Sequence, residues 1–399
     1  MEDVASSGRT YSIDTVLEYA RGIAALWVFM FHITSMFGLS SPFLQTIARY
    51  GYQGVALFFV ISGYCMFAAA EKTVASNHKP SQFLMRRIIR VFPPFWLSIV
   101  VVVLMPYLLE GLSALHSGKF SQPFPLWLQF SSMDWLQLLT LTKIFSSQGG
   151  DLQEVFSPVN SVYWTLAIEF QFYLVIYVAM HFRSIWKKIL ACIFLISLVT
   201  FFLPYIDYKG FFIQFWPSFS FGVLLRILHQ MGVTPSTVFR DREKLISLSA
   251  SSALFILVLV SIFVEPCAIA FFCSKVPNLT FTMASGFSAV LLWFLGGVEH
   301  SSRRAPDRVH IEKSFWLWVL LPFSWLGQAS YSVYLLHGKL YQLPEMFIRQ
   351  FVSLNNIAYP LLVLLTTIAM CIVFYRIFEK PFQHGGKKIF SIQSNLVQR

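Results

Sequence analysis

Long runs of apolar residues alternate with short polar linkers along almost the whole chain. An α-helix needs about 20 such residues to cross the hydrocarbon core of a bilayer. The pattern therefore predicts an all-α fold, a polytopic transmembrane bundle that forms one domain over residues 1–399, with its helices within 13–382. Ten runs have roughly the required length: 13–36, 51–70, 91–109, 160–182, 185–204, 211–229, 245–265, 279–298, 316–340 and 356–378.

The composition agrees with a membrane protein and leaves no room for a large soluble domain. Hydrophobic residues make up 56% of the 399 residues and charged residues only 12%, about half the charged share of a soluble protein. We attribute the net charge of +11 to the loops of a membrane protein and expect no nucleic acid partner. The first residues lack the basic region and cleavage site of a signal peptide, so we expect the first helix to be retained.

The distribution of Lys and Arg predicts the orientation in the membrane. Cytoplasmic loops carry an excess of these residues, so both termini and the tail 383–399 are predicted to be cytoplasmic. The linker 110–159 is then a long external loop, in which the WLQLLTLTKIF run forms an interfacial or re-entrant helix. Its Trp127 and Trp135 either anchor at the headgroups or stack on sugar rings. Of the 30 Lys and Arg residues, 22 lie in alternate linkers: the N-terminal tail, 71–90, 183–188, 226–244, 299–314 and 376–399.

The first apolar run carries four ionisable residues on one helical face: Asp14, Glu18, Arg21 and His32. Each ionisable group costs about 2.5–3.5 kcal/mol in the bilayer centre, so the default interpretation of such a stripe is a functional site. Arg21 and His32 are separated by about 16 Å along the axis, at a rise of 1.5 Å per residue. This spacing suits a charged anchor at one level and a reaction at another.

Three titratable residues reach a similar depth near the outer side: His32, Glu169 and His337. A neutral imidazole beside a carboxylate is suited to removing a proton from a hydroxyl near neutral pH. We therefore predict that His32 and Glu169 are catalytic, while each alone could equally be a buried polar residue satisfied by a neighbouring helix. The candidates for contacting the acceptor or an oxyanion are Ser62, Tyr173, Tyr334 and His337.

Arg86, Arg87 and Arg90 precede FPPFW at the predicted cytoplasmic start of the third span. Positive charge is common at this position in membrane proteins, but a guanidinium also binds phosphate through two parallel hydrogen bonds. Together with Arg21, these residues could hold a donor that has a phosphorylated head and a long thin arm. Acyl-coenzyme A has that shape.

The remaining chemistry-bearing residues predict neither a metal site nor a resident cofactor. The nine His residues are scattered without a metal-ligand spacing, and no nucleotide-binding loop is present. Of the five Cys residues, Cys267 and Cys273 flank the outer end of the seventh predicted span. They could form a disulfide if that side is oxidising.

From about residue 11 to 382, the chain resembles the acyltransferase-3 family of integral membrane acyltransferases. The resemblance rests on five stretches in this order: YSIDTVLEYARGIAALWVFMFH, GVALFFVISGY, MRRIIRVFPPFW, SVYWTLAIEFQFYL and LGQASYSVYLLHG, with FEKPF following near the end. It implies transfer of an acetyl group from acetyl-coenzyme A to a hydroxyl of an envelope glycan. His32 would be the catalytic residue, and Arg21, Arg87 and Arg90 would serve the donor. Asp14 departs from the usual spacing of the first motif and receives no role.

We therefore expect a multi-pass O-acetyltransferase of a bacterial inner membrane that acts on a surface polysaccharide or its lipid-linked precursor. His32 would act as general base or, alternatively, through an acyl-His32 intermediate. Glu169 would orient or stabilise its imidazolium. The rival interpretation is a proton-coupled transporter of a glycan or lipid, since intramembrane Glu and His suit a proton relay. A structural membrane protein would leave the ionisable stripe unexplained. The acceptor sugar, the acyl chain and the oligomeric state are not predicted.

Overall fold

The computed structural model describes residues 13–38, 40–117, 130–146, 152–200, 210–238, 279–302 and 322–383. Within them every regular element is helical, in agreement with the all-α prediction. The α-helices are α1 (Ile13–His32), α2 (Thr34–Gly38), α3 (Pro42–Arg49), α4 (Gln53–Ala75), α5 (Pro80–Ser117), α7 (Ser132–Leu139), α8 (Tyr163–Ala179), α9 (Trp186–Val199), α10 (Trp216–Gln230), α11 (Pro235–Val238), α14 (Leu279–Ser302), α16 (Ser330–Leu340), α17 (Gln342–Ile348) and α18 (Ala358–Phe374). Short 3₁₀ turns are η1 (Tyr50–Tyr52), η2 (Thr142–Ser146), η3 (Glu154–Phe156) and η5 (Phe212–Gln214), and η6 (Tyr375–Glu379) is a π-helix.

Nine of the ten predicted spans coincide with described helices, and the run 245–265 lies outside the described residues. The ninth span is represented by a helix over 322–328 and by α16. Among the described helices, three are long and apolar enough to cross a membrane: Pro42–Ala75, Pro80–Leu115 and Ala358–Gln383. Tyr163–Ala179 and Thr280–Gly296 are apolar but shorter. The count of ten crossings and the cytoplasmic termini remain predictions.

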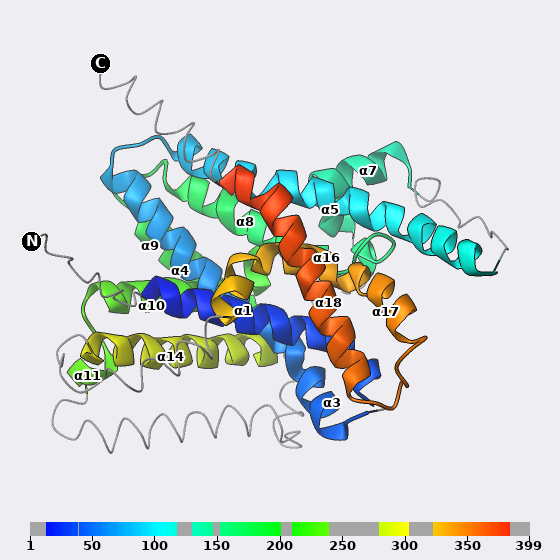
Figure 1. Ribbon diagram of the computed structural model, residues 1–399. Helices are drawn as coiled ribbons and strands as arrows, with labels where there is room; N and C mark the ends of the chain where they lie inside the picture. Colours follow the sequence, from blue (N-terminus) through cyan, green and yellow to red (C-terminus); the bar gives the residue numbers. More distant parts are fainter. Residues whose placement is uncertain are drawn as a thin grey trace, which may run out of the picture.

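Helix α4 is at the centre of the bundle, where it packs against α10, α1 and α14. Figure 1 shows α1 running between α14 and α16, with α18 crossing in front of α16. Buried aromatic rings fill the space between α4, α8 and α10. The Phe172 ring lies 5.4 Å from Phe59 and 4.6 Å from Phe219, centroid to centroid. These contacts fix the relative positions of the three helices.

Two glycines allow α4 and α10 to approach closely. A Cβ atom on Gly63 would lie 2.0 Å from the carbonyl oxygen of Phe219, and one on Gly222 would lie 1.9 Å from that of Val60. Such separations leave no room for any side chain. Small residues at helix contacts are typical of membrane proteins, because packing rather than burial from water holds the helices together.

Helix α5 begins earlier than the sequence predicts. It starts at Pro80 rather than near residue 91, so Arg86, Arg87 and Arg90 lie within the helix instead of preceding it. Pro93, Pro94 and Pro106 are all accommodated inside α5. The arginines consequently have a fixed helical spacing, in which Arg87 and Arg90 are one turn apart on the same face.

The predicted external loop contains the short helix α7, whose first turn is held by an ion pair between the half-buried Asp134 and the buried Lys143. Ser131 and Asp134 form a capping box at the start of α7. Lys143 Nζ donates to Asp134 Oδ1 at 2.6 Å and lies 5.0 Å from the Phe130 ring centroid. The hydrogen bond from Lys143, followed by those from Ser131, lowers the pKa of Asp134 to about 2.

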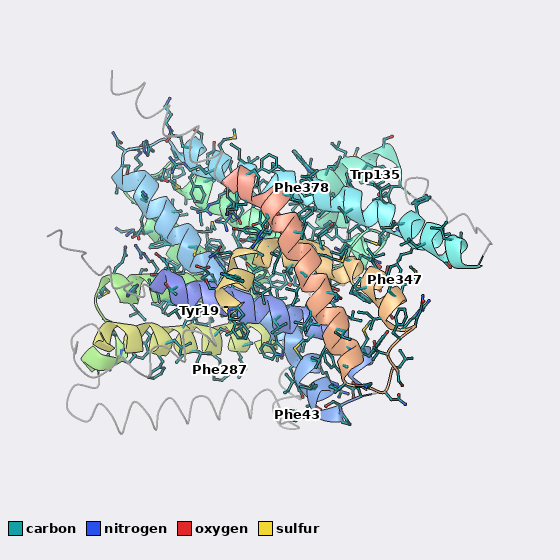
Figure 2. All side chains as sticks on the ribbon, in the orientation of Figure 1. Tyr19, Phe43, Trp135, Phe287, Phe347 and Phe378 are labelled. Atoms are coloured by element: carbon teal, nitrogen blue, oxygen red, sulfur yellow. The ribbon has the colours of Figure 1, made fainter. Side chains whose placement is uncertain are left out.

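Trp135 packs inward, with its ring 5.3 Å from that of Phe130, whereas Trp127 lies outside the described residues. Large apolar side chains cover the periphery of the bundle instead, as expected where lipid replaces water. Figure 2 shows two of them on separate helices, Phe43 on α3 and Phe347 on α17. They are 71% and 44% exposed, respectively.

Candidate functional site

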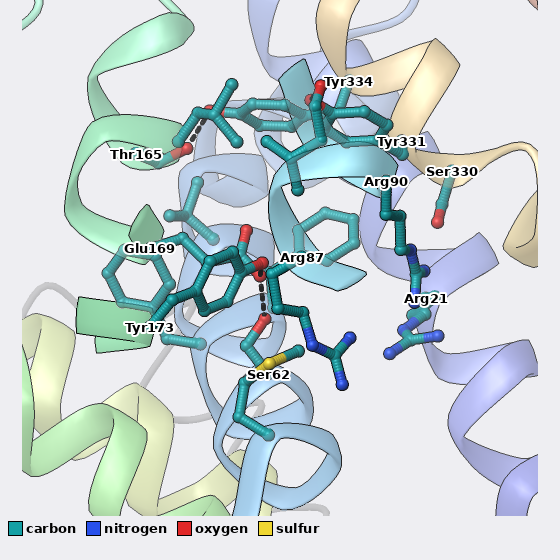
Figure 3. Close-up of a pocket in the computed structure, with 16 residues that line it drawn as sticks. Arg21, Ser62, Arg87, Arg90, Thr165, Glu169, Tyr173, Ser330, Tyr331 and Tyr334 are labelled. Atoms are coloured by element: carbon teal, nitrogen blue, oxygen red, sulfur yellow. Dashed lines mark hydrogen bonds between the residues drawn. The ribbon is translucent and has the colours of Figure 1, made fainter. Parts of the chain in front are cut away.

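The first of two adjoining cavities contains the predicted donor-binding arginines. This arginine pocket has a volume of about 90 Å³ and lies between α1, α4, α5, α8 and α16. Figure 3 shows the guanidinium groups of Arg21, Arg87 and Arg90 together on one side, with Glu169 and Tyr173 across from them. The polar lining residues are Arg21, Ser62, Arg87, Arg90, Thr165, Glu169, Tyr173, Ser330, Tyr331 and Tyr334.

The arginines enter the pocket from two helices. Arg21 projects from α1 and its Nη2 donates to the sulfur of Cys65 on α4 at 3.2 Å. Arg87 and Arg90 come from α5, and the Arg87 guanidinium also lies 5.7 Å from the Phe83 ring centroid. Arg86 is on another face of α5 and does not line the pocket. Three of the four predicted donor-binding residues are therefore brought together.

Glu169 belongs to the arginine pocket and is engaged by two hydroxyl groups. Its Oε1 accepts hydrogen bonds from Ser62 on α4 at 2.8 Å and from Tyr173 on α8 at 2.6 Å. Glu169 and Tyr173, which the sequence proposes separately as site residues, thus lie together, one helical turn apart. The carboxylate faces the arginines in a cavity that His32 does not line.

The second cavity, the histidine pocket, has a volume of about 270 Å³ and includes His32, the last residue of α1. Its wall is mostly aromatic, and the linker 110–159 contributes Leu152 and Gln153. The described end of that linker therefore lines the pocket that contains His32. The aromatic lining consists of Phe31, Tyr52, Trp164, Phe215, Phe281 and Tyr334.

The two pockets share Val55 and Tyr334 as lining residues. Tyr334 is held by hydrogen bonds that fix the position of its ring. Its hydroxyl donates to the carbonyl oxygen of Val162 and is also paired with the hydroxyl of Thr165. The arginine pocket and the histidine pocket therefore lie on either side of one fixed aromatic residue.

His337 lies behind His32 and is almost fully buried, at 1% exposure. The centroids of the two imidazole rings are 4.9 Å apart, with the ring planes at 65°. His337 Nδ1 is paired with the carbonyl oxygen of Val333 at 2.9 Å. The structure therefore places His337, rather than Glu169, beside His32.

The four ionisable residues of α1 separate into different surroundings. Glu18 accepts hydrogen bonds from Ser324 at 2.8 Å and Gln328 at 2.7 Å, which joins α1 to the helix over 322–328. Asp14 is exposed near the start of α1. Only Arg21 and His32 of the stripe line the pockets, one in each. The sequence pattern thus marks the right helix but not which of its charges are structural.

Four further polar residues in or beside the site were not predicted individually. Thr165, Ser330 and Tyr331 line the arginine pocket, and Tyr331 donates to the carbonyl of Val91 on α5 at 2.8 Å. Glu379 is buried and accepts a hydrogen bond from the backbone amide of Ser332 at 3.1 Å. Its place in the FEKPF motif, where a charged residue directly follows an apolar run, could have indicated Glu379.

Among the described residues, Cys65, Cys192 and Cys371 are free thiols, and no group of His, Cys, Asp and Glu is arranged to hold a metal ion. Cys267 and Cys273 lie outside the described residues, so their pairing remains a prediction.

Comparison with known proteins connects the site to one family. Residues 14–376 match the acyltransferase-3 model, described as an acyltransferase domain. Nodulation protein 10 of Rhizobium leguminosarum bv. viciae is 26% identical over 46% of this chain and 47% of its own length. The O-acetyl transferase of Shigella phage Sf6 is 28% identical over 40% of this chain and 44% of its own length. The peptidoglycan O-acetyltransferase OatA of Listeria monocytogenes is 23% identical over 85% of this chain and 52% of its own length.

The chain aligns with about half of the length of each of these relatives. No solved structure matches it. The family match nevertheless covers nearly all of the described helices and includes both pockets, from Arg21 to Tyr334. We conclude that the chain belongs to the acyltransferase-3 family.

Proposed function

We propose that the protein is a membrane O-acetyltransferase that transfers an acetyl group from cytoplasmic acetyl-coenzyme A to a hydroxyl group. The acceptor is a surface polysaccharide or its lipid-linked precursor, and the enzyme lies in a bacterial inner membrane. The names of two relatives, an O-acetyl transferase and a peptidoglycan O-acetyltransferase, support the reaction class. The carrying observation is that the arginine pocket and the histidine pocket meet at Val55 and Tyr334.

The donor binds at the arginine pocket. Arg21, Arg87 and Arg90 supply guanidinium groups that pair with phosphate oxygens. A cavity of about 90 Å³ is too small for a nucleotide, so the nucleotide stays at the mouth while the slender thioester arm enters. Glu169 accepts hydrogen bonds from Ser62 and Tyr173 and faces the arginines, which supports a role for it at the donor end.

The acceptor binds in the histidine pocket. Its volume of about 270 Å³ is near the lower end of the range for small-molecule sites, so it admits a single sugar unit rather than a long glycan segment. Tyr52 and Trp164 provide rings with which a sugar can make apolar contact, and Gln153 provides an amide. These groups would present one sugar hydroxyl to His32.

His32 acts as the general base of the transfer. It takes the proton from the acceptor hydroxyl while the oxygen attacks the thioester carbonyl carbon. A C–O bond forms, the C–S bond breaks, and the coenzyme A thiolate leaves and takes up the proton that His32 had removed, which restores the neutral imidazole. The outcome is an acetyl ester on the sugar and free coenzyme A. The Tyr334 hydroxyl, at the junction of the pockets, already donates to the carbonyl oxygen of Val162, so its ring shapes the passage between the pockets and does not hold the thioester carbonyl oxygen.

The test is transfer of label from radiolabelled acetyl-coenzyme A to glycan by the purified protein in liposomes. Replacing His32 with Ala should slow transfer by about 10²–10⁴-fold, the contribution of a positioned acid–base group. His181→Ala is the matched control, because His181 is exposed near the end of α8 and should leave the rate unchanged.

Two outcomes would contradict the proposal in different ways. Wild-type transfer by the His32→Ala protein would remove the base assignment but keep the reaction. Absence of coenzyme A release by the wild-type protein, with acceptor present, would remove acetyl-coenzyme A as the donor. Movement of a glycan across the liposome membrane without release of coenzyme A would favour the transporter interpretation.

A further inference from the structure

His337 has one nitrogen whose hydrogen-bonding role is defined by the backbone. Its Nδ1 lies 2.9 Å from the carbonyl oxygen of Val333, one helical turn earlier in α16. A carbonyl oxygen only accepts, so Nδ1 carries the hydrogen and donates it. In the neutral ring this leaves Nε2 with a lone pair, as a hydrogen-bond acceptor. The tautomer of His337 is thus set by α16 itself.

The other nitrogen of His337 is a buried acceptor without a donor. No atom of the described residues hydrogen-bonds to Nε2, although the side chain is only 1% exposed. Buried polar groups are nearly always paired, because an unpaired one loses its hydrogen bonds to water without replacement. The ring neighbours are Phe29 at 5.6 Å, Tyr334 at 5.8 Å and His32 at 4.9 Å between centroids. The Tyr334 hydroxyl already donates to Val162, so His32 is the neighbour with a free N–H to offer.

Helix α16 is too firmly held for His337 to adapt its position. Four hydrogen bonds join residues 331–335 of α16 to other parts of the chain. They are the hydrogen bonds of Tyr331 to Val91 on α5, of the Ser332 amide to Glu379 on η6, of Tyr334 to Val162, and of Asn160 to the carbonyl of Leu335. In addition, a Cβ on Gly338 would lie 2.6 Å from Asn160 Oδ1, so this side of α16 is closely packed.

His32 is less constrained, because it is the terminal residue of α1 and is only partly buried. The torsion that rotates a histidine ring about its Cβ–Cγ bond is broad. With centroids 4.9 Å apart and planes at 65°, the edge of one imidazole ring faces the other ring. Rotation of the His32 ring about its Cβ–Cγ bond can therefore bring an N–H toward the lone pair of His337 Nε2.

We propose that His337 is a positioning residue for His32: its Nε2 accepts the N–H of His32 and thereby selects the tautomer in which the other nitrogen faces the histidine pocket. This inference rests on the proposed role of His32 as base. The imidazolium that forms when His32 takes the acceptor proton is then stabilised, because a hydrogen bond from a charged donor is stronger than one from a neutral donor. The pair performs the orienting function that a carboxylate was predicted to perform.

Two substitutions at His337 isolate the Nε2 acceptor. In His337→Asn the amide reaches only as far as Nδ1 and leaves the Nε2 position without an acceptor. In His337→Gln the longer side chain can place its carbonyl oxygen there. We expect the Asn variant to lower kcat by about 10²-fold, the lower end of what a positioned acid–base system contributes, with KM for acetyl-coenzyme A unchanged. The Gln variant should recover at least part of that loss.

The matched control is His181→Asn. His181 Nδ1 is also 2.9 Å from the carbonyl oxygen one turn earlier, that of Tyr177, but His181 is exposed, so its replacement should not change kcat. A wild-type kcat in His337→Asn would overturn the proposal. Equal losses in the Asn and Gln variants, or a raised KM together with reduced protein in the membrane, would also overturn it in favour of a packing role. If His32→Ala itself transfers normally, the proposed function fails first, and the two failures are distinguishable.

Discussion

Glu169 Oε1 is the shared acceptor for Ser62 and Tyr173, at 2.8 Å and 2.6 Å, and through Ser62 it joins α8 to α4. A carboxylate in an apolar bundle is costly unless it is hydrogen-bonded and near opposite charge. Both conditions are met here, since Arg21, Arg87 and Arg90 line the same pocket. Glu169 therefore has a structural task as well as its proposed place at the donor end.

Replacing Glu169 with Leu should destabilise the protein, because it leaves two hydroxyl groups without their acceptor and three arginines without a carboxylate. A buried group that loses its partner costs about 1–3 kcal/mol. Thermal unfolding in detergent should show a lower Tm for Glu169→Leu than for Glu169→Gln, which keeps an acceptor oxygen. Equal melting temperatures for the two variants would contradict this account.

The arginine pocket predicts how donor affinity responds to loss of guanidinium groups. A hydrogen bond to a charged group contributes about 1.5–3 kcal/mol, so Arg87→Ala and Arg90→Ala should each weaken acetyl-coenzyme A binding by about 10- to 100-fold. Isothermal titration would measure this. Arg86→Ala should cost less, since Arg86 does not line the pocket. Arg49→Ala, on the exposed end of α3, should bind normally. A wild-type Kd in the Arg87 and Arg90 variants would exclude the pocket as the donor site.

Helix packing makes a prediction that is independent of activity. Gly63→Ala places a Cβ within 2.0 Å of the Phe219 carbonyl, and overpacking of this kind costs about 1–3 kcal/mol. Gly111→Ala in α5 meets no atom within 4 Å and should be neutral or stabilising by up to about 1 kcal/mol, because Ala favours the helix. Gly63→Ala should therefore lower the Tm, whereas Gly111→Ala should leave it unchanged or raise it. A normal Tm for Gly63→Ala would show that α4 and α10 are further apart than described.

The segment that contains α7 should open at acidic pH. The pKa of Asp134 is lowered from its usual 3.8 to about 2 by Lys143, so its interaction stabilises the fold above pH 3.8 and is lost as the pH falls through 2. The protection factors of the α7 amides, which are corrected for the pH dependence of intrinsic exchange, should therefore fall between about pH 4 and pH 2. In Asp134→Asn the same protection factors should be low at neutral pH and should lose this pH dependence. If the pH dependence in Asp134→Asn equals that of the wild type, the ion pair does not stabilise α7.

The helices themselves were predictable, because the length of an apolar run is almost enough to identify a membrane helix. The residues at which the helices begin and end were less predictable. Helix α5 begins at Pro80, about ten residues before the apolar run, since charged side chains such as Arg86 can continue a helix beyond the hydrocarbon layer.

The partners within the site were only partly predictable. Sequence gives the depth of a residue along its helix, and it correctly brings Arg21, Arg87 and Arg90 to one level. It does not give the rotation of one helix relative to another. The depth argument could therefore not distinguish Glu169 from His337 as the neighbour of His32, and the ring contact at 4.9 Å was only visible in the structure.

Val55 and Tyr334 stand between the two pockets, and this has a consequence for the cell if the proposed function holds. A channel of water through the bundle would dissipate the proton gradient across the membrane. An aliphatic side chain beside a hydrogen-bonded aromatic ring interrupts such a channel while no donor is bound, and in the proposed reaction the thioester arm takes the place of water between them.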